Sequence, residues 1–150
     1  MEHHTEQSPR LRPEATIDIL REVMKGYLPE LVGMEIVALR EGAISGRLQV
    51  QKSLMAPNGF LHAATIVALA DTCCGMGTAA HLPEGASLFT TVELKCNFLG
   101  TVREGGITCD AELVQSGRHI QVWDATVKAE DTGHKICLFR CTQMILWPKP

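Results

Sequence analysis

The hydrophobic and polar positions of this chain follow two periods, and each period predicts one kind of element. Between residues 13 and 28 apolar side chains recur every three or four positions, which predicts an amphipathic helix with Gly26 as its stop signal. Residues 33–39 and 43–50 predict a short β-hairpin. Residues 61–80 are small or apolar at nearly every position and contain no proline, which predicts a long helix buried on most sides.

Polar and apolar residues alternate through four later segments, 88–99, 107–115, 119–130 and 136–147, and alternation predicts half-buried strands. In the first of these, Leu94 and Cys96 fall on the apolar face, while Thr91 and Lys95 fall on the polar face. Short turns at 103–106, 116–118 and 131–135 predict an antiparallel meander. The element order predicts an α+β fold, with a curved antiparallel sheet of about five to six strands around one central helix.

Length and composition narrow the class of protein. The 150 residues fit one domain, predicted at 13–150, after a polar and disordered tail at 1–12. The net charge of −3 argues against a nucleic-acid-binding surface. The polar N-terminus does not resemble a signal peptide, so we expect a cytoplasmic protein with reduced thiols. The cysteine spacings favour neither a metal site nor a redox site. The cysteines are Cys73, Cys74, Cys96, Cys109, Cys137 and Cys141.

Asp71 is the only side chain between residues 61 and 80 with a full charge at neutral pH. A carboxylate there is costly, so it either faces a cleft or interface or hydrogen-bonds to a neighbouring amide or hydroxyl. A membrane span is disfavoured, because Asp71, His62 and three threonines would lie in lipid. Cys74 lies three residues after Asp71, but no histidine is placed to activate it, which favours core packing.

Three stretches together resemble the hotdog-fold acyl-CoA thioesterases, in particular the phenylacetate-degradation and 4-hydroxybenzoyl-CoA thioesterase branch. They are NGFLHAATIVALAD, TTVELKCNFLGTVREGG and SGRHIQVWDATVKAEDTGHKICLFRCTQMIL. The resemblance covers residues 33–147. That family opens its central helix with His-Gly-Gly and has an acidic residue nine positions after the histidine, as His62 and Asp71 do here. It implies hydrolysis of an acyl- or aryl-CoA to free acid and CoA, without a cofactor other than the CoA of the substrate.

Three positions depart from the family pattern. Ala63 and Ala64 replace the two glycines, and the backbone N–H that binds the thioester oxygen in the family would here belong to Ala63. An alanine keeps that donor but adds a methyl group near the acyl carbonyl. Ala56 stands where many relatives have Gln or Asn, and Asn58 is the nearest amide.

Thioester hydrolysis needs a base or nucleophile and a donor for the oxyanion. Asp71 suits the first role as either base or nucleophile, and the Ala63 N–H at the positive end of a helix suits the second. Nine residues at 100° place His62 and Asp71 on opposite sides of one helix. Two antiparallel copies would bring them together, which predicts a homodimer or a dimer of dimers, and the family likewise has its sites between subunits.

Other candidates rest largely on the resemblance. His62 is either part of the substrate site or only a helix-entry residue. Thr91 either hydrogen-bonds the catalytic carboxylate or its water, or is an exposed strand threonine. The candidate substrate contacts, with CoA phosphates as partners of the basic ones, are Asn58, Gly59, Lys95, Arg103, Gly117, Arg118 and His119. The alternatives are a non-catalytic acyl-CoA-binding hotdog module, favoured by the lost glycines and disfavoured by Asp71, and a hotdog hydratase or dehydratase.

Overall fold

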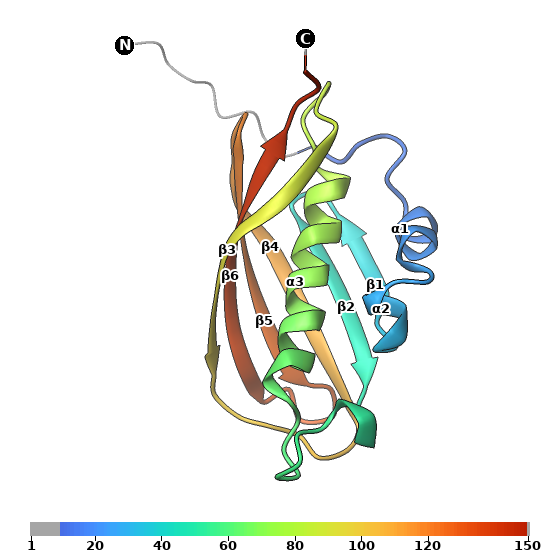
Figure 1. The fold of residues 1–150 in the computed structure, drawn as a ribbon, viewed down its shortest axis with the longest axis vertical. Helices are drawn as coiled ribbons and strands as arrows, with labels where there is room; N and C mark the ends of the chain where they lie inside the picture. The colour runs from blue at the N-terminus through green and yellow to red at the C-terminus, as the bar shows by residue number, and fades with distance from the viewer. Residues whose placement is uncertain (1–9, 150) are drawn as a thin grey trace.

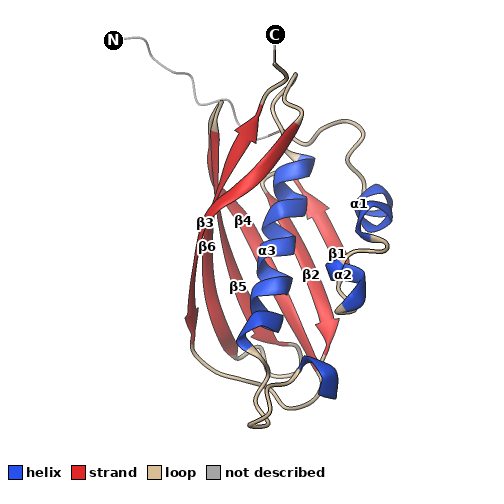
Figure 2. Cartoon of the chain, in the orientation of Figure 1, coloured by secondary structure: helices blue, strands red, loops and turns tan. Residues whose placement is uncertain are grey.

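A six-stranded antiparallel sheet curves around one long helix, α3 (Ala63–Ala80), in the computed structural model, which describes residues 10–149 (Figures 1 and 2). The strand order is β1-β2-β4-β5-β6-β3. The strands are β1 (Glu35–Arg40), β2 (Ala43–Gln49), β3 (Leu88–Phe98), β4 (Gly106–Ser116), β5 (Ile120–Ala129) and β6 (Lys135–Leu146). The shorter helices are α1 (Ile17–Met24), α2 (Leu28–Leu31) and the 3-10 turn η1 (Lys52–Leu54). This confirms the predicted α+β class and hotdog fold.

The central helix fills the concave side of the sheet, and Leu69, Cys73 and Cys74 are fully buried. A Cβ atom on Gly77 would come within 2.7 Å of the Trp123 ring. The backbone of α3 at Gly77 therefore packs directly against the Trp123 side chain of β5. α3 is long and apolar enough to span a membrane by length and composition alone, but 56% of it is buried inside the protein. Its apolar circumference is therefore explained by core packing.

The N-terminal segment forms two short helices where the sequence predicts one helix with Gly26 as its stop. Thr16 caps α1 by accepting a hydrogen bond from the Ile19 N–H. Gly26 has a φ of +80°, which ends that helix, and Pro29 lies in the first turn of α2. Of the predicted disordered tail, residues 1–9 lie outside the described residues, whereas the Arg12 guanidinium donates to three backbone carbonyls after α3.

The chain bends at 103–105 as predicted, but the expected pairing of β3 with β4 across that turn is wrong, although β4, β5 and β6 do follow one another through hairpins. β3 pairs with β6 at one edge of the sheet, and β4 pairs with β2 and β5 in its interior. The intervening loop crosses beneath the start of α3, where the Gly105 carbonyl accepts from the Val50 N–H at 2.8 Å (Figure 1). Local turn residues carry no information about this non-local pairing.

A β-bulge at Val92 reverses the phase of β3. Thr91 pairs with Gln143 and Glu93 pairs with Thr142, so Val92 is an extra residue. Gln143 is fully buried, and paired residues share a face, so Thr91 faces α3. The prediction that Thr91 lies on the polar face is therefore wrong, because strict alternation does not allow for an inserted residue.

Candidate active site

The start of α3 is held in place by local hydrogen bonds. The Leu54 carbonyl accepts from the His62 N–H at 3.1 Å and from the Thr65 hydroxyl at 2.8 Å. His62 is the N-cap, and its Nδ1 accepts from the Ala64 N–H at 2.9 Å. The helix thus begins at Ala63 rather than at residue 61. The Ala63 N–H is exposed and has no hydrogen-bond partner among residues 10–149. It is a free donor at the positive end of the helix dipole.

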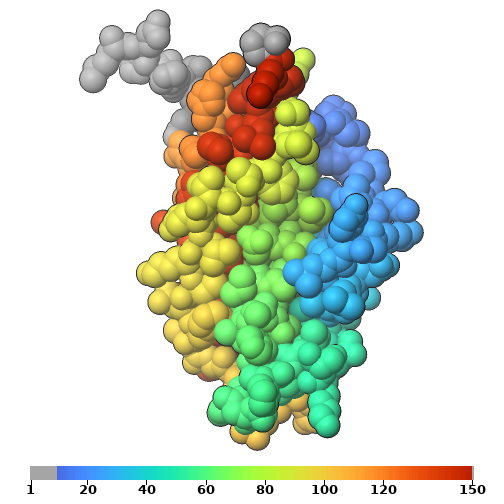
Figure 3. Space-filling model, in the orientation of Figure 1, coloured from blue at the N-terminus to red at the C-terminus, as the bar shows by residue number. Residues whose placement is uncertain are grey.

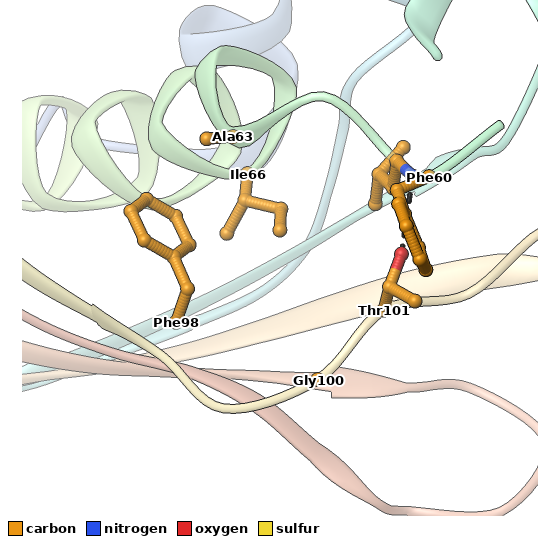
Figure 4. A pocket seen from close by; sticks show the side chains of 7 residues that line it. Phe60, Ala63, Ile66, Phe98, Gly100 and Thr101 are labelled. Atoms are coloured by element: carbon orange, nitrogen blue, oxygen red, sulfur yellow. Dashed lines mark hydrogen bonds between the residues drawn. The ribbon is translucent and has the colours of Figure 1, made fainter. Parts of the chain in front are cut away.

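A pocket of about 330 Å³ opens beside this free N–H (Figure 4). Its lining is mostly apolar and consists of Phe60, Leu61, Ala63, Ile66, Phe98, Gly100 and Thr101. The Thr101 hydroxyl is engaged as acceptor from the Leu61 N–H at 3.1 Å. Ala63 is one of the lining residues, whereas Ala64 is not. The pocket therefore offers apolar surface next to a single unpaired backbone donor.

Asp71 lies in the middle of α3 on the side that faces β3. Its side chain is partly buried, and Oδ1 is fully enclosed without a hydrogen-bond partner. Burial raises the pKa of Asp71, and the Thr91 hydroxyl beside it acts in the opposite direction when it donates to the carboxylate. The bulge thus brings Thr91 to Asp71, as the family resemblance implies, from the face that alternation did not predict. A carboxyl with a raised pKa and a free oxygen is suited to proton transfer near neutral pH.

Sequence reasoning missed Gln143, which lies behind Thr91. The Thr91 Oγ1 and Gln143 Oε1 atoms are 2.9 Å apart, and the Gln143 side chain has no exposed surface. A signal was present, because Gln143 shares the period of Phe139, Cys141 and Ile145 and therefore falls on the buried face of β6. A glutamine at such a position predicts a buried hydrogen-bond network.

One chain does not bring all the candidate residues together. His62 and Asp71 are separated by about 14 Å along the axis of α3 and face opposite sides. Cys74 is buried, and a hydrogen bond with Cys141 together with that burial raises the pKa of its thiol well above the usual value. This favours packing over a nucleophilic role. Among residues 10–149 no group of three or more His, Cys, Asp or Glu side chains could hold a metal ion.

The candidate substrate contacts divide into separate groups. The Asn58 side-chain oxygen accepts from the Phe60 N–H at 3.2 Å within the turn before α3. Gly59 has a φ of +83° in that turn, and the Arg103 guanidinium lies 5.3 Å from the centre of the Phe60 ring. These residues gather near the pocket.

Lys95 and the turn between β4 and β5 lie elsewhere. Lys95 is on the outer face of the sheet, in register with Arg140. Gly117, Arg118 and His119 lie beyond the opposite end of α3, where Arg118 stacks 4.4 Å from the Trp147 ring and the His119 carbonyl accepts from the Ile145 N–H. Within one chain these residues do not approach the pocket.

Known proteins share both sequence and fold with this chain. Residues 58–135 match the family model of the thioesterase superfamily. The 1,4-dihydroxy-2-naphthoyl-CoA hydrolase of Listeria monocytogenes is 30% identical over 115 residues, which cover 77% of this chain and 92% of the relative.

Two solved structures extend the likeness. A thioesterase from Haemophilus influenzae has a TM-score of 0.84 at 29% identity and covers 91% of this chain and 94% of its own. A hypothetical thioesterase from Streptococcus pneumoniae, solved with coenzyme A, has a TM-score of 0.70 at 21% identity over 79% and 89% of the two chains, which shows likeness of fold alone. The family match covers more than half of the chain and agrees with the fold, so the chain belongs to the thioesterase superfamily and is a thioester hydrolase.

Proposed function

We propose that this protein is an acyl-CoA thioesterase that hydrolyses an acyl- or aryl-CoA, with Asp71 as base or nucleophile and the Ala63 N–H as oxyanion donor. The observation that carries the proposal is the enclosed, unpaired Oδ1 of Asp71 on the same helix as the unpaired Ala63 N–H. Buried polar atoms are normally paired, and exceptions occur at sites that bind or react.

The residues support two chemical routes. In the first, Asp71 takes a proton from water, the water oxygen attacks the thioester carbonyl, and the Ala63 N–H stabilises the oxyanion. Collapse of the tetrahedral intermediate then breaks the C–S bond and releases the CoA thiolate, which takes up a proton. In the second, the Asp71 carboxylate attacks directly, and water then hydrolyses the resulting anhydride.

Both routes need a second copy of the chain. β3 has one unpaired edge and exposes Val92, Leu94 and Phe98, and one side of α3 stays open between β3 and the short helices (Figure 3). An antiparallel partner on this face would set the partner's Asp71 near Ala63 of the first chain. It would also carry the partner's Arg118 toward the mouth of the pocket, where its guanidinium would meet the CoA phosphates.

The substrate class is proposed from the pocket and from relatives. The apolar lining suits an acyl or aryl group. The name of the Listeria relative supports an aromatic acyl-CoA, and the CoA-bound pneumococcal neighbour supports CoA as the carrier. Assignment to the phenylacetate or 4-hydroxybenzoyl-CoA branch stays part of this proposal, as do a cytoplasmic location and catalysis without an added cofactor.

Subunit complementation tests the shared site. Ala63→Pro removes only the proposed donor, because proline fits the first helical position and His62 already has the extended backbone that precedes a proline. Asp71→Asn removes the carboxylate. Each variant alone should release CoA at less than about 1% of the parent rate across a panel of acyl-CoAs.

Co-expression of the two variants should restore activity. Random pairing makes half of the dimers mixed, and each mixed dimer has one intact site, so about a quarter of the parent activity should return. Mixed dimers without activity would contradict a site built from two chains. A parent protein that releases no CoA from any acyl-CoA in the panel would overturn the proposed function itself.

A further inference from the structure

Two buried glutamines lie side by side on the face of the sheet that packs against α3. Gln143 on β6 and Gln121 on β5 are in register, and neither has exposed surface. Gln121 donates to the His81 carbonyl at 2.8 Å and accepts from the Trp123 indole N–H at 3.0 Å. Burying a primary amide in a core is costly unless it is hydrogen-bonded, so each glutamine serves particular partners.

The partner of Gln143 is the hydroxyl that lies beside Asp71. Gln143 Oε1 accepts from Thr91 Oγ1 at 2.9 Å, while Gln143 Nε2 donates to Cys141 Sγ at 3.4 Å. A hydroxyl has one proton, so Thr91 cannot donate to Gln143 and to Asp71 at the same time. The contact with Gln143 has hydrogen-bond geometry, whereas Asp71 Oδ1 has no partner. This geometry favours Gln143 as the acceptor of the Thr91 proton.

We propose that Gln143 is a positioning residue of the hydrolytic site, because its side-chain carbonyl takes the Thr91 proton and turns the Thr91 oxygen toward Asp71. The inference rests on the proposed function of Asp71. With its proton engaged, Thr91 offers Asp71 and its surroundings only an acceptor. A water molecule that donates one hydrogen to Asp71 and the other to Thr91 would then have its lone pair free for attack.

The same arrangement keeps Asp71 basic. If the Thr91 proton turned to Asp71, it would stabilise the carboxylate, which is the direction in which Thr91 acts on the pKa of Asp71. Gln143 competes for that proton and so opposes this lowering. A carboxylate without the donated proton is the stronger base.

The other titratable groups that face Asp71 within the same chain are thiols. Cys74 on α3 and Cys96 on β3 both feel the Asp71 charge, and burial helps to raise the pKa of both thiols above the usual value. Cys141 on β6 contacts Cys74, and it too is fully buried. His62, which a partner copy would bring to the same site, is exposed and remains unchanged in every variant below.

The test is the pH dependence of kcat/KM in Gln143→Met, which keeps the side-chain length and removes the amide. The feature to measure is the acid limb, which is the fall in kcat/KM at low pH as Asp71 takes up a proton. The freed Thr91 proton should turn to Asp71, so we expect the limb to move to lower pH by about 0.5 to 1 unit. The plateau kcat should fall a few-fold. Gln143→Asn, which withdraws the carbonyl from Thr91 but stays polar, should move the limb in the same direction and serves if the methionine variant does not fold.

Gln121→Met is the matched control, because it removes an equally buried glutamine whose hydrogen bonds go to His81 and Trp123 rather than to Thr91. It should leave the limb where it is. In a Thr91→Val background, Gln143→Met should no longer move the limb. A limb that stays fixed in both Gln143 variants, moves to higher pH, or moves equally in Gln121→Met would overturn the proposal.

A titration independent of turnover separates this inference from the proposed function. The carboxyl carbon of Asp71 can be followed by NMR in protein with labelled aspartate and identified by its loss in Asp71→Asn. Its midpoint should fall in Gln143→Met and not in Gln121→Met. If the parent hydrolysed no acyl-CoA, the proposed function would fail, while this titration would still decide whether Gln143 controls the Thr91 proton.

Discussion

At the scale of single residues, the same burial that suits Asp71 to proton transfer also makes its ionised form destabilise the fold. Its pKa is raised above the usual 3.8 by burial. The folded state therefore holds the Asp71 proton more tightly than the unfolded state. As the pH rises from 3.8 through the raised pKa, the contribution of Asp71 to the stability of the fold is lost. At neutral pH the ionised side chain is therefore a net cost to the fold, as is expected of a group kept for reaction.

Asp71→Asn should separate these two effects. At pH 7 we expect the Tm to rise by about 1 to 4 °C, because a neutral amide replaces a half-buried carboxylate. Turnover should fall by roughly two or more orders of magnitude. Thermal unfolding at pH 7 and at pH 4 checks the cause, since the gain should shrink at the lower pH. A lower Tm at pH 7 with normal turnover would make Asp71 a structural carboxylate.

Ala63 and Ala64 form a matched pair for testing substrate choice. Of the two, only Ala63 lines the pocket, so Ala63→Gly should raise the ratio of kcat/KM for bulky over slim acyl-CoAs, on the order of tenfold. Ala64→Gly should leave that ratio unchanged. Both should cost less than about 1 kcal/mol of helix stability, because they lie in the first turn. Equal ratios in the two variants would mean that neither methyl meets the acyl group.

At the scale of elements, hydrophobic period predicted the type and approximate extent of the long segments. α3, β4, β5 and β6 each bury the face that the sequence indicates, because period follows burial. The small residues of α3 also correctly predicted close packing, which Gly77 and Trp123 provide. What local pattern did not predict was the position of β3 at the edge of the sheet.

The candidate site was predictable only where a residue's role is local. His62 starts the helix and Asp71 is its one carboxylate, and both follow from spacing. The approach of Thr91 to Asp71 depends on the Val92 bulge and on the pairing of β3 with β6. In that pairing Thr91 meets Gln143, which is 52 residues away in sequence. Gln143 enters through that same pairing. A single sequence does not specify where an extra residue is inserted into a ladder.

At the scale of the whole molecule, the uncovered face of β3 and α3 predicts self-association. Leu94 is 41% exposed on the side of β3 that faces α3, and Leu138 is 42% exposed on the outer face of the sheet. Leu94→Asp should therefore give a monomer at micromolar concentration and lose turnover, because the charge would be buried in the interface. Leu138→Asp should stay at least dimeric. Sedimentation equilibrium of both variants and the parent decides the matter, and a stable, active parent monomer would contradict it.

The six free cysteines have a practical consequence for measuring how the molecule opens. Five of them have no exposed surface, and only Cys96 on the edge strand is partly accessible. A thiol reagent should therefore label Cys96 when β3 moves locally, and should label the other five only when the sheet separates from α3. Because these thiols line both sides of the helix–sheet contact, the order of labelling would record the sequence of opening events without any engineered probe.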